Sequence, residues 1–353
     1  MRTPSQAVAG KLSRATTAVI FTGFVFAGSE SLAVEREHPT LTLRTPLELD
    51  IRPHREMRTD QTSPLAARPE ALLTWNAPNS GLFSDPANWS AGVPGAGDDL
   101  NFGGTGAASY VAQNDQVLVS YGNVVVNRSG TGTTTIVGPI DALRLRVDAG
   151  NFEMSGDADF TAVGENPFGS SGSLDPTFSV GNVAGQTATY TQSSGNVAVF
   201  QSGAVAPFAT TSVGNMPGAT GIFNLNGGTF LTQGVMGVGN GTGTYNISAG
   251  IAAAGQFQPA RNAGSSGTLN LGGGAEDAEL QVIRLWGSFD DGNAQLNVGA
   301  NGVLIVGSTT SFNGQAVLGG GDGNSSFELN MTDGAVLGVF GNSFIGSYSN
   351  NLG

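Results

Sequence analysis

The chain has 353 residues, 55 of them Gly, and it contains no Cys, which excludes disulfide frameworks, thiolate metal sites and cysteine nucleophiles. Residues 71–353 carry five Arg, no Lys and nineteen Asp or Glu, a net charge of −14 that repels nucleic acid and anionic lipid. Both His residues, His38 and His54, precede residue 71, so residues 71–353 cannot form a Ser-His-Asp triad or a His-ligated zinc site.

Residues 1–33 have the pattern of a secretory signal peptide. Basic residues come first, an apolar run follows from Ala15 to Gly28, and Ser31-Leu32-Ala33 places small residues at the −3 and −1 positions of a cleavage site. The apolar run is shorter than the roughly 20 residues that a membrane-spanning helix needs. We therefore predict a secreted or cell-surface protein with no direct membrane span beyond its leader. An uncleaved leader that anchors the chain is the alternative.

Two further segments precede the repeats. Residues 34–70 mix charges with scattered Pro and contain little Gly, which is typical of a charged linker or disordered extension. Residues 71–106 set Trp75, Phe83, Trp89 and Phe102 among Gly, Pro, Asn and Asp turns. A stack of strands needs its open end covered, so we predict that this aromatic segment is a cap.

The same segment carries the pattern W…FSDPANW…GVPGAGDDLNF between Trp75 and Phe102. This pattern resembles the segment that opens many large bacterial surface proteins with autotransporter-type β-strand repeats. The resemblance covers about 30 residues directly, and it implies an exported protein with Gly-rich β repeats. It implies nothing about a ligand.

An apolar-Asn-apolar triplet recurs through the rest of the chain, each time followed by a Gly turn and a second apolar strand. The triplets are Phe223-Asn224-Leu225, Tyr245-Asn246-Ile247, Leu269-Asn270-Leu271, Leu296-Asn297-Val298 and Leu329-Asn330-Met331. Tyr190 is the start of an earlier copy with Thr191 in place of Asn, and a third short strand has the motif Val-Gly-Asn. Repeats of this period predict an all-β fold, a parallel β-solenoid with irregular coils of roughly 22–33 residues over 107–353.

Alternation along a strand places the two apolar residues of each triplet on one face and the Asn on the other. We predict that the apolar pair faces the core and that the Asn lies outside. A stacked amide ladder inside the core is the alternative. A β-propeller fits these spacings poorly, and a disordered chain is disfavoured because 39% of the residues are hydrophobic. The last residues still have repeat character, so we expect the natural chain to extend beyond Gly353.

Few residues are candidates for chemistry. Asp290 and Asp291, beside Trp286 and Phe289, could serve as acid and base on a glycoside, although turn chemistry also explains an Asp-Asp-Gly-Asn sequence. Residues 319–324 and the acidic residues Glu276, Asp277 and Glu279 are candidates for structural calcium.

Arg144 and Arg146 share a strand face and could together bind an acidic sugar or a phosphate. The simpler interpretation is that the two arginines lie on a solvated outer face and balance the negative charges of Asp141 and Asp148.

The sequence therefore assigns no catalytic, cofactor-binding or metal-binding residue. We expect a non-catalytic extracellular or cell-surface repeat protein, an adhesin-like, matrix or passenger scaffold whose partners are glycans or cell-surface components. The alternative is a polysaccharide-active β-helix enzyme, a hydrolase or lyase that uses Asp290 and Asp291. Nucleic acid is not expected as a partner, and the sequence does not predict the oligomeric state.

Overall fold

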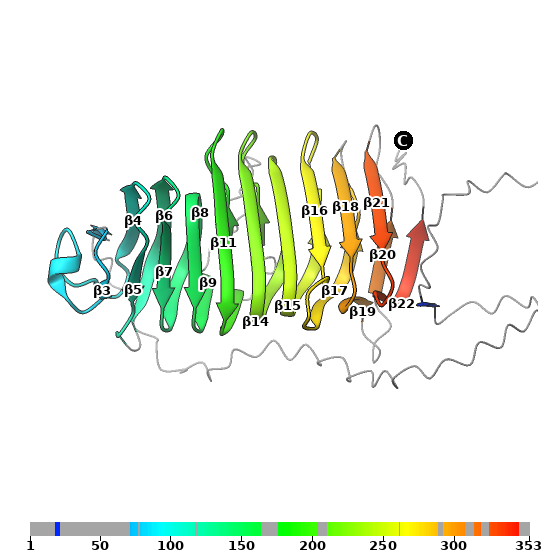
Figure 1. Cartoon of the computed structure of the whole chain (residues 1–353), viewed down its shortest axis with the longest axis horizontal. Helices are drawn as coiled ribbons and strands as arrows, with labels where there is room; N and C mark the ends of the chain where they lie inside the picture. Colours follow the sequence, from blue (N-terminus) through cyan, green and yellow to red (C-terminus); the bar gives the residue numbers. More distant parts are fainter. Residues whose placement is uncertain are drawn as a thin grey trace, which may run out of the picture.

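The computed structural model in Figure 1 describes residues 18–21 and 71–345, apart from 77, 117–118, 164–175, 203–209, 261, 289–291, 308–313 and 319–324. The described strands form one 22-stranded sheet, and every pairing between named strands is parallel. Among these residues the helical content is a single 3-10 turn, Pro86–Asn88. The prediction of an all-β protein with parallel strands is confirmed.

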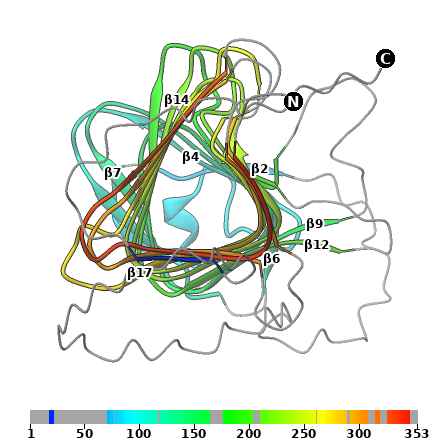
Figure 2. The same ribbon diagram turned by 90° about the vertical axis from the view of Figure 1, so that its right-hand side faces the viewer.

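Seen along the direction in which the strands stack, the sheet has a triangular outline (Figure 2). We call its sides A, B and C, in the order in which the chain visits them. Long strands bend around corners, so that β8 (Ile140–Ser155), β14 (Thr220–Val238) and β15 (Thr242–Gln258) each contribute to all three sides.

Side A holds the triplets of the sequence repeat. It comprises β3 (Gly81–Leu82), β5 (Tyr110–Gln113), β7 (Thr133–Val137), the end of β8, β11 (Thr187–Ser194), the starts of β14 and β15, β16 (Ser266–Leu271), β18 (Asn293–Val298) and β21 (Ser326–Met331).

Side B follows side A across the Gly turns. It comprises the start of β8, β9 (Ala158–Val163), β12 (Asn196–Ser202), the middle of β14 and β15, the start of β17 (Ala278–Trp286), β19 (Gly302–Gly307), the start of β22 (Val336–Ile345) and β1 (Ala18–Phe21).

Side C completes the outline. It comprises β2 (Leu72–Thr74), β4 (Asp99–Thr105), β6 (Ser120–Ser129) from Asn123 onward, the middle of β8, β10 (Phe178–Val180), β13 (Thr210–Val213), β20 (Gly314–Leu318) and the ends of β14, β15, β17 and β22. The predicted Val-Gly-Asn strand lies here, because Val180, Val213 and Val238 are in register.

Glycines make the corner between sides A and B. Gly195, Gly228 and Gly250 have φ of 81°, 78° and 85° at this corner, a left-handed conformation that other residues rarely adopt. A Cβ on Gly228 would also collide with the carbonyl oxygen of Gly195, which lies in the neighbouring turn between β11 and β12. The Gly turns after the triplets are therefore needed both for the bend and for close stacking.

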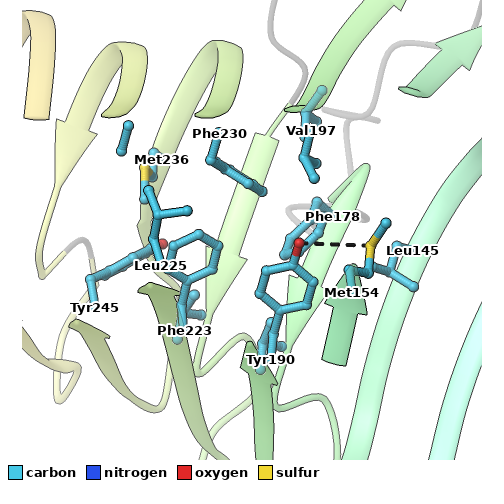
Figure 3. Close-up of a cluster of buried hydrophobic side chains, with 14 of the residues drawn as sticks. Leu145, Met154, Phe178, Tyr190, Val197, Phe223, Leu225, Phe230, Met236 and Tyr245 are labelled. Carbon is cyan, nitrogen blue, oxygen red and sulfur yellow. Dashed lines mark hydrogen bonds between the residues drawn. The ribbon is translucent and has the colours of Figure 1, made fainter. Parts of the chain in front are cut away.

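The core is a continuous column of inward side chains. On side A, Tyr190 stacks on Phe223 with ring centroids 5.3 Å apart, and Phe223 lies 5.5 Å from Tyr245 (Figure 3). Phe178 from side C and Phe230 from side B meet these rings edge to face. Burial of such aromatic rings is the main stabilising contribution of the fold.

An aromatic cluster ends the column beside β2 and β3. Trp75 meets Trp89 edge to face at 4.9 Å, and the Trp89 indole nitrogen donates to the Phe83 carbonyl oxygen at 3.0 Å. Phe83 and Phe102 are fully buried against these rings. The aromatics of the segment predicted as a cap therefore pack on one another and on the end of the core.

Of the predicted signal peptide, the structure describes only β1, which pairs with β22 from Ala18 opposite Val336 to Phe21 opposite Val339. The linker prediction for 34–70 lies outside the described residues. The domain boundaries and the cleavage site stay predictions.

Candidate functional site

The Asn residues of the triplets lie on the outer face of side A. Phe223 and Leu225 are fully buried while Asn224 between them is only partly buried, and the next three triplets follow the same pattern. In the fifth triplet Leu329 and Met331 are partly buried against the core and Asn330 is exposed. The predicted orientation is confirmed.

The amides nevertheless stack into a ladder on this outer face, although a ladder was considered only for Asn residues inside the core. The side-chain nitrogen of each Asn donates to the oxygen of the Asn on the preceding strand. The distances are 2.8 Å from Asn246 to Asn224, 2.8 Å from Asn270 to Asn246, 2.8 Å from Asn297 to Asn270 and 3.0 Å from Asn330 to Asn297. Asn224 itself donates to the Thr191 hydroxyl at 3.2 Å, so Thr191 takes the first place in the ladder.

Two more outward rows run beside the ladder, because residues two and four positions earlier on each strand point the same way. One row is Thr189, Ile222, Thr244, Thr268, Gln295 and Glu328. The other is Thr187, Thr220, Thr242, Ser266, Asn293 and Ser326. We call the three rows together the polar strip. The two Thr-rich rows were not predicted, although the Thr-x-Thr-x-Asn order is visible in the sequence of β15.

The polar strip is almost uncharged. From β11 to β18 its outward residues are hydroxyls and amides with the exception of Ile222, and Glu328 on β21 is its one charged side chain. The Glu328 carboxylate accepts a hydrogen bond from Gln295 at 3.3 Å. Beneath the strip, burial raises the pKa of Tyr190 and of Tyr245, so the core stays neutral under the ladder.

The other candidate residues do not form a site among the described residues. Asp290, Asp291 and Phe289 lie outside the described residues, as do 319–324, while Trp286 is partly buried on side C. Glu276 is exposed, and Glu279 accepts from Gln281 at 2.7 Å. Within the described part of the chain, no three His, Asp or Glu residues gather as metal ligands would.

Two of the arginines, Arg146 and Arg128, are held by contacts within the protein. Arg146 donates to both oxygens of Asp148 at 3.1 Å, which confirms the balancing interpretation for this pair. Arg128 is buried, lies over the Tyr110 ring at 4.9 Å and donates to the Ala108 carbonyl oxygen at 2.7 Å. This arginine belongs to the packing of the strand ends rather than to a surface site.

Comparisons with known proteins give no relative: no family model, no curated protein and no solved structure matches this chain. No helix within the described residues has the length and apolar character to cross a bilayer.

Proposed function

We propose that this chain is a non-catalytic, exported repeat protein of the bacterial cell surface or extracellular matrix, built as a parallel β-solenoid. Sides A, B and C are then the three faces of each coil, and side-A strands that follow one another are 22 to 33 residues apart in the ladder. The polar strip carries this proposal. A surface that repeats the same weak polar contacts on successive strands suits adhesin-like, multivalent attachment.

The composition of the leader and the opening pattern from Trp75 to Phe102 support export and a place among bacterial surface proteins with autotransporter-type repeats. Glycans or other cell-surface components are the proposed partners. The acidic surface, with a net charge of −13 for the chain, disfavours nucleic acid.

Export is tested by expressing the full chain in a bacterial host and sequencing the N-terminus of the product in each cell fraction. We expect the protein outside the cytoplasm, beginning at Val34. A protein that stays in the cytoplasm with its leader intact would overturn the proposed location.

The enzymatic alternative needs a separate test, because the pair Asp290 and Asp291 lies outside the described residues. The assay offers the protein acidic and neutral polysaccharides with and without Ca²⁺ and follows product release. We expect none. Release that disappears in the variant Asp291→Asn would replace the scaffold proposal by a polysaccharide-active enzyme.

A further inference from the structure

We propose that the polar strip binds one extended chain of a neutral, β-linked polysaccharide that lies along the stacking direction of the strands, with one sugar over each strand. The inference rests on the proposed function, since it names the ligand of the surface described there. Four properties of the strip lead to it: its charge, its free hydrogen-bonding groups, the ordering of those groups and their spacing.

Charge complementarity points to a neutral ligand. From β11 to β18 the polar strip presents hydroxyls and amides apart from Ile222, whereas residues 71–353 as a whole are strongly acidic. An anionic polymer would meet the surrounding negative field, and a cationic one would find its partners on the acidic surfaces rather than on the strip. A polyhydroxyl chain without charge matches the strip itself.

Each ladder amide keeps hydrogen-bonding capacity for a ligand. Asn246 donates one N–H to Asn224 and accepts one bond from Asn270. A primary amide has two N–H donors and two oxygen lone pairs, so one donor and one acceptor site remain on Asn246, and likewise on Asn270 and Asn297. Sugar hydroxyls both donate and accept, so they can use both groups at once.

The ladder also orders these groups before any ligand arrives. The amides of Asn224, Asn246, Asn270 and Asn297 are each held by neighbours on both sides, and their side-chain nitrogens point toward the preceding strand. Binding then does not have to freeze free side chains, which lowers the entropic cost of association.

The spacing between neighbouring strands favours an extended polymer as the ligand. Neighbouring strands lie about 4.8 Å apart, so the same donor and acceptor recur at that interval along the strip. The sugars of an extended β-linked polysaccharide advance by a similar distance. One chain can therefore place one sugar over each of the strands β11, β14, β15, β16, β18 and β21, and because successive sugars turn over, hydroxyls from alternate edges of the chain meet successive amides.

A length series tests this geometry. Neutral β-1,4-linked oligosaccharides of two to eight sugars are titrated against the full exported protein by calorimetry, and an anionic oligogalacturonate series is run in parallel. We expect affinity to rise with each added sugar up to about six and then level off, because each sugar adds a contact that is already positioned. Affinity that is constant from two sugars upward, or binding of the anionic series alone, would overturn the proposal.

The variant Thr268→Glu locates the contact. Its row already accommodates Glu328, which receives a hydrogen bond from Gln295, and Gln295 is also the neighbour of Thr268. The fold should therefore tolerate the change, while a carboxylate in the middle of the strip should weaken binding of the longest oligosaccharide by about tenfold or more. The control Gln315→Glu places the same charge on side C, opposite Arg284, and should bind as the unmodified protein does.

Two outcomes separate this inference from the proposed function. If Thr268→Glu folds and binds as tightly as the unmodified protein, the strip is not the binding surface, and the cell-surface role stands without this ligand. If the protein binds the oligosaccharides as described but remains in the cytoplasm, the ligand assignment stands and the proposed location falls. A dimer that dissociates in the variant Thr268→Glu would show that the strip mediates self-association, and this result would also overturn the glycan assignment.

Discussion

A single hydrogen-bonded carboxylate, that of Asp115, joins the segment after β3 to the segment that follows β5. Asp115 accepts from the Ser84 hydroxyl at 2.5 Å and from the Ser84 backbone nitrogen at 3.0 Å. The hydroxyl bond is the largest influence that holds the pKa of Asp115 below its ordinary value of 3.8. A lowered carboxyl pKa contributes stability above the unfolded pKa, and that stability is lost as the pH falls through the folded pKa.

We therefore predict that Ser84→Ala raises the pKa of Asp115 toward 3.8, as measured by NMR titration of its carboxyl carbon. The stability difference between the two proteins should be present at neutral pH and should vanish at a pH below both pKa values. The control Ser80→Ala removes the acceptor of the Val111 backbone N–H and should leave the titration of Asp115 unchanged. An Asp115 pKa that is the same in all three proteins would contradict the assignment.

At the scale of residues, the direction of each side chain could be predicted because alternation is local. Phe223, Asn224 and Leu225 need only their own order to show which of them faces the core. The outer ladder could not be predicted in the same way. It depends on the register between residues 22 to 33 positions apart, and that register is set by the turns and insertions between them.

At the scale of elements, the Gly corner between sides A and B is tightly constrained. Gly228 combines φ of 78° with a backbone oxygen in the space that a Cβ would need, whereas Gly185 has φ of 75° and open space around it. Gly185→Ala should cost only the conformational strain of about 1–2 kcal/mol. Gly228→Ala should cost more, because β12 and β14 would also have to move apart.

Denaturant unfolding of the two variants measures this difference. Equal losses of unfolding free energy would show that strand stacking at the corner is looser than the structure indicates.

The sequence predicted the strands of side A and the Gly turns more completely than the strands of side C. The triplets repeat five times with flanking Gly, which is a strong signal. On side C, β10 has only the three residues Phe178–Val180, too short for a periodic pattern to identify. Here the motif Val-Gly-Asn was the available signal, since its Val is buried and its Gly has a positive φ in Gly181 and Gly214.

At the scale of the whole molecule, the stack is nearly one-dimensional, since each strand pairs with the strands directly before and after it on its own side. The free energy of unfolding of such a protein is close to a sum of contributions from neighbouring strands of the stack. A destabilising substitution at one end should therefore affect mainly the strands near that end. The aromatic cluster at β2 and β3 tests this property, because Trp75 is buried there and contacts Phe83, Trp89, Phe102 and Tyr110.

We predict that Trp75→Ala destabilises the strands nearest the aromatic cluster by about 3–5 kcal/mol, the usual loss for a buried Trp. The middle of the stack should remain folded. Hydrogen exchange should accelerate in β4 and β5 and remain slow in β15 and β16, which share no pairing with the cluster. The matched variant Phe223→Ala removes a ring from the centre of the column and should instead accelerate exchange in β11 and β15, its direct neighbours. Acceleration that is uniform along the chain in both variants would mean that the stack unfolds as one cooperative unit. The aromatic cluster would then stabilise the whole protein rather than protect one end.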